Sequence, residues 1–151
     1  MAKTEILKQV TIKNKRASFE YSFLDTYSAG IVLSGTEIKS IRQSKANITD
    51  SFCVFLGTEL FVRAMNIAKY ELGTDANHDP IRDRKLLLSK KELSKLSNKL
   101  KDQGLTIVPT KLYINDKGLA KIDIALAKGK KLFDKRDSIK EKDVKRDLER
   151  K

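Results

Sequence analysis

Apolar and polar residues alternate along much of the chain, which is the pattern of half-buried β-strands. The alternating runs are short, and they occupy residues 10–12, 18–24, 31–33, 52–56, 60–65, 105–114 and 119–127. Gly57-Thr58-Glu59 and Asn115-Asp116-Lys117-Gly118 lie between consecutive runs and predict β-hairpins, because these are turn-forming residues. Six or so short strands with one good helix between them predict a mainly β fold. The leading candidate is a six-stranded antiparallel barrel of the oligonucleotide-binding (OB) type with accessory α-helices.

Residues 89–104 carry the period of a helix instead. Ser89 and Glu92 form a capping box at its start. A single apolar stripe follows, formed by Leu93, Leu96 and Leu100. Gly104 stands where a C-terminal cap belongs. We therefore expect a helix with one apolar face.

Residues 35–51 begin with a second, shorter helical pattern. Thr36 can cap this helix, and Ile38 and Ile41 share a face that can point into a core. The opposite side is expected to be in solvent and to hold Glu37, Lys39, Arg42 and Lys45. Cations on this side can bind phosphates and the carboxylate can accept hydrogen bonds, which suits recognition of a nucleic acid. From this stretch alone, an ordinary solvated face explains the pattern as well.

Residues 66–84 are irregular and polar and predict a long loop.

The last part of the chain differs in composition from the rest. Residues 128–151 hold eleven lysines and arginines and six acidic residues, with few apolar residues at irregular spacing. A segment that cannot bury an apolar stripe is expected to be disordered when free and to become helical on an anionic surface. We therefore predict an RNA-binding barrel domain over residues 1–127 and a basic tail over 128–151.

Charge narrows the class of partner. The chain has 32 lysines and arginines and 20 acidic residues among 151 residues, a net charge of +12. This excess favours nucleic acid first and an anionic membrane surface second. No apolar run approaches the roughly 20 residues needed to cross a bilayer, and the N-terminus lacks a secretory signal. We expect a cytoplasmic protein that does not bind membranes.

Candidate chemistry is sparse. His78 with Asp75 and Asp79 makes a weak metal site in a flexible loop, and a solvated histidine is the simpler interpretation. Cys53 is the single cysteine, which excludes an internal disulfide, and it is expected to fill the core. No catalytic set or phosphate-cradling glycine loop stands out. We predict no catalytic residue, no metal and no cofactor.

Aromatic residues offer stacking surfaces for bases. Tyr21, in an alternating strand, is expected to be half in the core. Tyr113 lies between Leu112 and Ile114, so its ring is expected on the wetter face of its strand. Phe133 lies in the basic tail, where it can stack on a base or pack transiently on the barrel.

Four separated strings identify a family. They are N-K-R-A (14–17), G-T-E-I-K-S-I-R with K-A-N-I-T-D-S (35–51), D-P-I-R-D-R-K-L-L-L (79–88) and A-K-G-K-K-L-F-D-K-R (127–136). Their order and spacing from about residue 8 to 146 resemble the SmpB family, the small protein B or SsrA-binding proteins of bacteria.

The resemblance implies a non-enzymatic adaptor on an OB-type barrel. Such a protein binds the tRNA-like domain of transfer-messenger RNA (tmRNA, SsrA) and delivers it to stalled ribosomes for trans-translation. This process rescues the ribosome and tags incomplete proteins for degradation. The implied partners are tmRNA, the small-subunit decoding centre and mRNA channel and, indirectly through alanyl-tmRNA, elongation factor Tu. We expect a monomer whose tail folds in the empty channel.

The resemblance also implies two sets of contact residues. The set expected to bind tmRNA is Asn14, Lys15, Arg16, Glu37, Arg42, Lys45, Leu87 and Lys121. The set expected to bind the ribosome is Lys128, Lys130, Lys131, Phe133, Asp134, Lys135 and Arg136. Ser28 and Phe133 depart from the residues usual in the family, which are acidic at the first position and histidine or tyrosine at the second.

Two other functions fit the residues. One is a generic single-strand RNA-binding or ribosomal protein with an OB-type fold. The other is a metal-dependent nuclease, for which the scattered acidic residues give no positive support.

Overall fold

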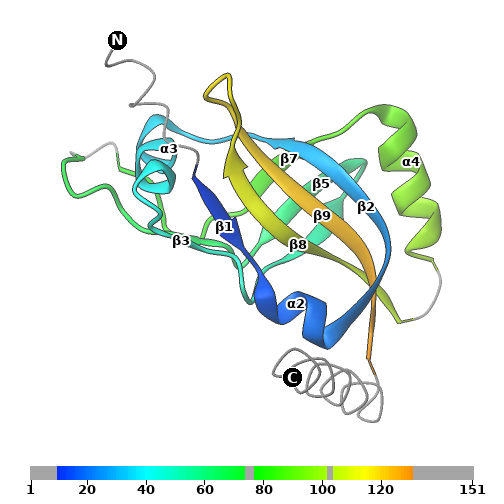
Figure 1. Cartoon of the computed structure of the whole chain (residues 1–151). Coiled ribbons are helices and arrows are strands. Elements are labelled where there is room, and N and C mark those ends of the chain that lie inside the picture. The colour runs from blue at the N-terminus through cyan, green and yellow to red at the C-terminus, as the bar shows by residue number, and fades with distance from the viewer. Residues whose placement is uncertain (1–9, 74–76, 102–103, 131–151) are drawn as a thin grey trace, which may run out of the picture.

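The computed structural model describes residues 10–73, 77–101 and 104–130. The main element of this part of the chain is one strongly curved antiparallel sheet (Figure 1). Its strands are β1 (Thr11–Lys13), β2 (Tyr21–Ile31), β4 (Phe52–Leu56), β5 (Glu59–Arg63), β7 (Arg84–Leu87), β8 (Leu105–Ile114) and β9 (Ala120–Gly129). A separate two-stranded pair joins β3 (Ala46–Asn47) to β6 (Asn66–Ile67). The fold is thus mainly β, as the alternation predicts.

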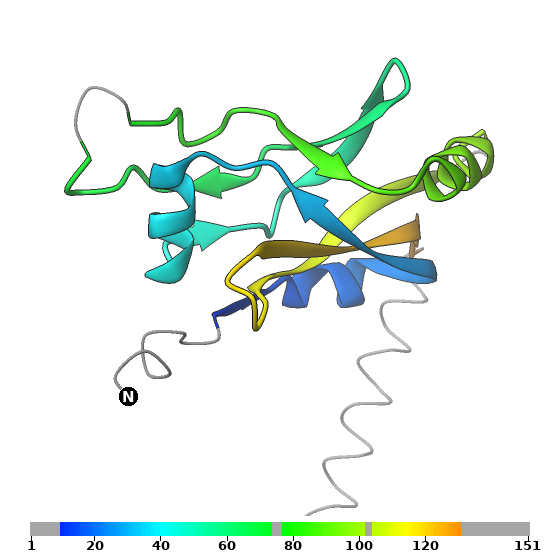
Figure 2. The ribbon, with the colours of Figure 1, turned by 90° about the horizontal axis from the view of Figure 1, so that it is seen from above.

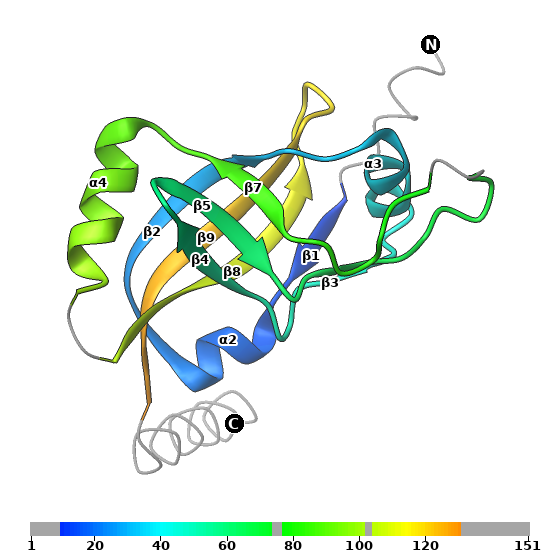
Figure 3. The ribbon, with the colours of Figure 1, turned by 180° about the vertical axis from the view of Figure 1, so that it is seen from behind.

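The sheet closes on itself as a ring. The strand order is β8-β4-β5-β7-β2-β9, and β9 pairs back onto β8 along most of its length. β1 adds a seventh strand at the edge of β8, next to residues 111–113. Figures 1 and 3 show β8, β9 and β2 on one side of the ring and β4, β5 and β7 on the other. Closure lets most strands pair on both edges and encloses one core.

The core lies inside this ring. Its fully buried side chains alternate along the strands, and they include Leu60, Val62, Leu86, Ile107, Leu112, Ile122 and Ile124. Cys53 is buried among them, which confirms the prediction that it fills the core. Tyr21 packs with a smaller cluster formed by Ala17, Val108 and Ala127, and is half-buried as expected.

Two helices lie at opposite ends of the ring (Figures 1 and 2). α3 (Gly35–Arg42) follows β2, and α4 (Lys90–Lys99) follows β7. Both start with a complete capping box, formed by Ser34 with Glu37 in α3 and by Ser89 with Glu92 in α4. The Ser89 box confirms the prediction, whereas α4 ends at Lys99 rather than at Gly104.

A third helix was not predicted. α2 (Lys15–Glu20) occupies the start of the run that the alternation of Phe19, Tyr21 and Phe23 assigns to a strand. Asn14 caps this helix through its side chain, so the N-K-R-A string at 14–17 is a helix start. The strand begins only at Tyr21 and then runs through Gly30 to Ile31 without a break.

The turns and the long loop largely follow the sequence pattern. Both predicted hairpins are present: β4 and β5 flank Gly57-Thr58, and the Gly118 amide donates to the Asn115 carbonyl oxygen at 2.9 Å. Residues 68–83 contain no strand or helix within the described ranges, but β7 and β6 lie at the two ends of the predicted loop. No helix of the described chain has both the length and the apolar character that a membrane span requires.

Candidate nucleic-acid interface

The sheet brings distant residues into one row on its outer face. Leu87 of β7 pairs with Gly30 of β2, Gly30 with Lys121 of β9, Lys121 with Tyr113 of β8, and Tyr113 with Thr11 of β1. Directly paired residues point to the same face of a sheet. The residues next to them in their strands, such as Leu86, Ile122 and Leu112, are buried, so this row faces outward. We call these five residues the outer row; it crosses five strands, or about 19 Å.

A second row beside the first supplies more polar groups. Lys111 lies with its Nζ 4.8 Å from the centre of the Tyr113 ring and 3.6 Å from Asp123 Oδ2. Ser28 is paired with Asp123, and its hydroxyl lies 3.0 Å from the Tyr113 hydroxyl. This face therefore combines an aromatic ring, lysines and hydroxyl groups, which is the chemistry that binds bases and phosphates.

Gly30 allows the outer row to close. A Cβ built at Gly30 would lie 3.3 Å from Leu87 Cβ, so a side chain there would push against the leucine. A glycine inside a strand commonly marks a bulge or a close approach of the backbone. The structure shows the close approach, while the bulge lies earlier in β2, between Phe23 and Asp25.

Asn14 is held inside the protein. Its side-chain oxygen accepts from the Ala17 amide at 3.1 Å, and its Nδ2 donates to the carbonyl oxygens of Ile48 at 3.2 Å and Pro109 at 2.9 Å. Both polar atoms of the Asn14 side chain, through which it could contact RNA, are therefore used to fix α2 against β8. An RNA contact by Asn14 stays a prediction, and the geometry gives this side chain a positioning role.

Replacing Asn14 by alanine is expected to lower the free energy of unfolding by about 2–3 kcal/mol, because a helix cap and two buried hydrogen bonds are lost. Urea denaturation followed by circular dichroism measures the change. The matched control is Ser18→Ala, which removes only an exposed hydrogen bond to the Lys15 carbonyl and should cost less than about 0.5 kcal/mol. Equal losses in the two variants would contradict the role given to Asn14.

The remaining cations predicted to bind RNA lie at the surface. Lys15 and Arg42 are exposed, and neither has an ion-pair partner among the described residues. Arg16 pairs with Glu20 at 3.0 Å and with Asp50 at 3.3 Å. Lys45 pairs with Glu71 at 2.6 Å. Lys15 and Arg42 are thus free for phosphates, whereas the other two would exchange an existing partner.

Glu37 is the main departure from the sequence analysis. The expectation that it faces solvent is wrong, because its side chain is 0% exposed. The N-cap of α3 is Ser34 rather than Thr36, and the helix turns Glu37, Ser40 and Ile41 inward. Ile38, expected to be core, is only half-buried.

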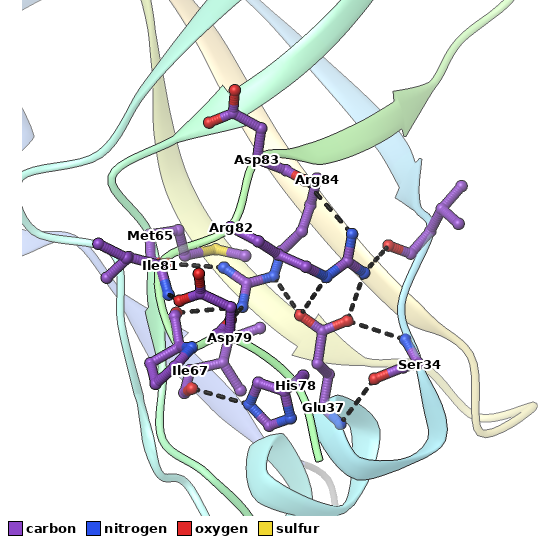
Figure 4. Close-up of polar contacts among 12 residues, drawn as sticks. Ser34, Glu37, Met65, Ile67, His78, Asp79, Ile81, Arg82, Asp83 and Arg84 are labelled. Carbon is purple, nitrogen blue, oxygen red and sulfur yellow. Dashed lines mark hydrogen bonds and ion pairs between the residues drawn. The ribbon is translucent and has the colours of Figure 1, made fainter. Parts of the chain in front are cut away.

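Two arginines surround the buried Glu37 carboxylate (Figure 4). The Arg84 Nε donates to one of its oxygens, and Arg82 donates to both, at 3.1 Å through Nε and at 2.5 Å through Nη2. The Ser34 amide adds a fourth donor at 2.8 Å. Arg84 is itself fully buried and also donates to the carbonyl oxygens of Met65 and Pro80. The cluster fastens α3 to the start of β7.

These contacts set the charge of the cluster. Burial alone would raise the pKa of Glu37, but the hydrogen bonds from Arg82, the Ser34 amide and Arg84 outweigh it and hold that pKa below its ordinary value of 4.5. Burial lowers the pKa of Arg84, although Glu37 acts in the opposite direction. Glu37 remains an anion at neutral pH, and an RNA contact through its side chain would require this cluster to open.

His78 belongs to the same region and is also buried. Its Nδ1 lies 2.9 Å from the Thr36 hydroxyl and its Nε2 lies 2.9 Å from the Ile67 carbonyl oxygen. The expectation of a solvated loop histidine is therefore wrong. Asp75, the third member of the weak metal site, lies outside the described residues. Within the described ranges, no group of three or more His, Cys, Asp or Glu residues is arranged to hold a metal ion.

The residues predicted to bind the ribosome begin at the end of β9. Lys128 is exposed on this strand, which continues to Gly129. The Lys130 amide donates to the Glu20 carbonyl oxygen at 2.9 Å, and its Nζ to that of Ser18 at 3.3 Å. The other residues of this set lie outside the described residues; they are Lys131, Phe133, Asp134, Lys135 and Arg136. The predicted folding of the tail concerns the same part of the chain and stays a prediction.

Comparison with known proteins decides the family. The model of the family described as "SmpB protein" matches residues 11–151. The chain is 57% identical over 150 residues to an SsrA-binding protein of Cytophaga hutchinsonii, covering 99% of this chain and 98% of the relative. It is 61% identical over 141 residues to one of Bacteroides thetaiotaomicron, covering 93% and 94%. The chain belongs to the SmpB family.

A solved structure agrees with this membership. It is described as "tmRNA-SmpB: a journey to the center of the bacterial ribosome", and it matches with a TM-score of 0.69 and 49% identity over 82% of this chain and 86% of the other. In this SmpB-family chain, two residues predicted to bind RNA, Leu87 and Lys121, are brought into the outer row through Gly30. Lys111 and the two arginines of the buried cluster were missed. Of these residues, only Lys111 has a signal in the sequence: its alternation with Leu112 could have indicated that it lies on the outer face of the strand.

Proposed function

We propose that this chain binds the tRNA-like domain of tmRNA and carries it to stalled ribosomes for trans-translation. The observation that carries the proposal is the outer row, in which Leu87 and Lys121 lie beside Tyr113 in a chain of the SmpB family. The net charge of +12 supports an RNA partner. The chain acts as an adaptor and performs no catalysis.

The closed ring of strands is assigned to the OB-type barrels, with residues 1–127 as the RNA-binding body. The predicted boundary at residue 128 falls within β9, which continues to Gly129. The basic tail follows this strand and enters the small-subunit decoding centre and mRNA channel. Elongation factor Tu takes part through alanyl-tmRNA. The protein acts in the cytoplasm as a monomer.

The outer row can recognise folded RNA in two ways. Lys121 supplies a charge that can neutralise a phosphate, and such contacts weaken as salt rises. Leu87, a residue that is 52% exposed, supplies apolar contact that salt screens little. The buried Glu37 cluster fixes the start of β7 and so the position of Leu87 at its end. The shape of the sheet then selects the shape of the RNA, and its lysines supply the charge that binds phosphates.

Two variants separate these contributions. Lys121→Ala is expected to weaken binding to a tRNA-like RNA several-fold and to reduce the slope of log affinity against log salt by about 0.9. Leu87→Ala is expected to weaken binding with the slope unchanged. Filter binding or fluorescence anisotropy over a series of salt concentrations measures both. Lys91→Ala, an exposed position on α4 away from the row, is the matched control.

The same assay discriminates the alternatives. Wild-type protein should prefer the tRNA-like RNA to an unstructured oligomer of equal length at raised salt. Equal affinities would favour a generic single-strand binder. Cleavage of either RNA that requires a divalent metal would favour a nuclease.

A further inference from the structure

A pocket of about 620 Å³ opens between α4, β7 and the tip of the β4–β5 hairpin. Figures 2 and 3 show the hairpin tip and α4 next to each other at this end of the ring. Known small-molecule sites have volumes of about 300–1,000 Å³, so the space fits one nucleotide. Apart from Leu87, the residues that line the pocket lie outside the outer row.

The pocket has apolar walls. Phe55 and Leu93 line it and pack against the main core, so their exposed sides form a fixed surface. Leu87, an exposed residue, lines it as well. Apolar and aromatic walls of this kind hold the flat face of a nucleobase.

The helix side of the pocket is polar. Ser94, Ser97 and Asn98 line it, and spacings of three and four residues place them on one face of α4. All three are exposed, and their side chains make no hydrogen bond within the described ranges. Hydroxyl and amide groups are the donors and acceptors that recognise the edge of a base.

Charge and continuity indicate an RNA occupant. α4 carries four lysines and one glutamate, and Lys90 lies at the pocket. Lys85 lies there too, paired with Glu59 at 2.5 Å. Leu87 belongs both to the pocket and to the outer row, so one RNA can cover the two without a gap. A basic surface around an apolar peptide-sized groove would also suit an acidic peptide, but a peptide would not explain the continuity with the outer row.

We propose that this pocket holds one unstacked nucleobase of the RNA bound along the outer row, an inference that rests on the proposed function. The base lies against Phe55, Leu87 and Leu93, and its edge meets the α4 groups Ser94, Ser97 and Asn98. Lys90, which lies at the pocket at the start of α4, contacts a neighbouring phosphate. The pocket thereby selects an RNA that presents an unpaired base at a fixed distance from its helical part.

Filling the pocket tests the proposal. Full-length Ser97→Trp is expected to bind the tRNA-like domain of tmRNA about ten-fold or more weakly, because one stacked base is excluded. Lys91→Trp adds the same ring on α4 outside the pocket and should bind like wild type. Chemical probing of the RNA should show one unpaired base protected by wild type and by Lys91→Trp but not by Ser97→Trp. Circular dichroism checks that α4 is intact.

The outcomes separate this inference from the proposed function. If wild type binds and Lys121→Ala weakens binding while Ser97→Trp changes neither affinity nor protection, only the pocket assignment is overturned. If wild type shows no preference for the tRNA-like RNA, the proposed function fails and the pocket assignment fails with it.

A photo-crosslinking residue at position 97 gives a second measurement that does not depend on filling the pocket. In a mixture of the full-length protein, the RNA and ribosomes, a crosslink to a single RNA nucleotide supports the proposal. Crosslinks only to protein would overturn it and identify a peptide-binding groove.

Discussion

Replacing Glu37 by glutamine is expected to lower the free energy of unfolding by about 3–5 kcal/mol, which is the usual cost of removing one partner of a buried ion pair. The substitution keeps the shape of the side chain but leaves the fully buried Arg84 guanidinium without an anion. Urea denaturation of the full-length protein measures the loss. The loss is expected to be large because the Glu37–Arg84 pair is buried, and not because Glu37 makes several ion pairs.

The matched control is Glu59→Gln. Glu59 pairs with Lys85 at 2.5 Å, and both side chains are more than 40% exposed. Such surface pairs contribute about 0–1 kcal/mol. Similar losses for the two variants would contradict the argument from burial.

A double variant tests the same pair from the other side. Glu37→Leu with Arg84→Met removes both buried charges and should recover part of the stability lost in either single variant. Arg82, whose side chain is 37% exposed, can then turn toward water. If the double variant is as unstable as the sum of the singles, the two charges do not stabilise each other.

The depressed pKa of Glu37 also predicts how stability depends on pH. Because its pKa is lower in the folded protein than the ordinary 4.5, its contribution is fully present above that value. The contribution is lost as the pH falls below 4.5 and through the pKa of the folded state. Wild type should therefore lose more stability than Glu37→Gln over this acidic range, and denaturation curves at several pH values measure the difference.

Local patterns predicted the strands well where neighbours in sequence decide them. β8 matches the predicted run at both ends, and the hairpin at 115–118 is present. The capping box at Ser89 is local in the same sense. Each of these features is fixed by residues within a few positions of one another, so the sequence contains the whole cause.

The errors arose where a distant partner decides the structure. α2 replaces an expected strand because Asn14 is anchored by the carbonyl oxygens of Ile48 and Pro109. Glu37 turns inward because its partners Arg82 and Arg84 lie 45 and 47 residues away in sequence. A helical pattern of charged residues does not reveal such a partner, and a solvated face was the natural expectation.

The candidate interface shows the same difference between features set by neighbouring residues and features set by distant partners. The resemblance to the SmpB family predicts that Leu87 and Lys121 bind RNA, but alternation alone could not place them together. Their juxtaposition depends on the register of β7 and β9 against β2 and on the absence of a side chain at Gly30. The pocket beside α4 depends on how the β4–β5 hairpin and the helix end the ring, which no sequence period encodes.

Deleting residues 131–151 is expected to leave the affinity for the tRNA-like RNA within about two-fold of wild type and to abolish tagging of proteins made from messages without a stop codon. The outer row and the pocket lie wholly on β1, β2, β4, β5, β7, β8, β9 and α4 and the turns beside them, all of which end before residue 131. The deleted segment has nine lysines and arginines and six acidic residues, a net charge of only +3 of the total +12. Its removal should therefore change the salt-dependent part of binding little.

A full-length chain with residues 131–151 in shuffled order is the matched control for this deletion. It keeps the net charge and length of the tail but loses the order in which Phe133, Asp134, Lys135 and Arg136 occur. If the tail acts through specific contacts in the ribosome, the shuffled chain should bind the RNA and fail in tagging, as the deletion does. Tagging by the shuffled chain would reduce the tail to a source of charge. Tagging by the deleted chain would remove it from the mechanism and leave the whole function to the ring of strands, since binding of RNA and entry into the ribosome would then need no second element.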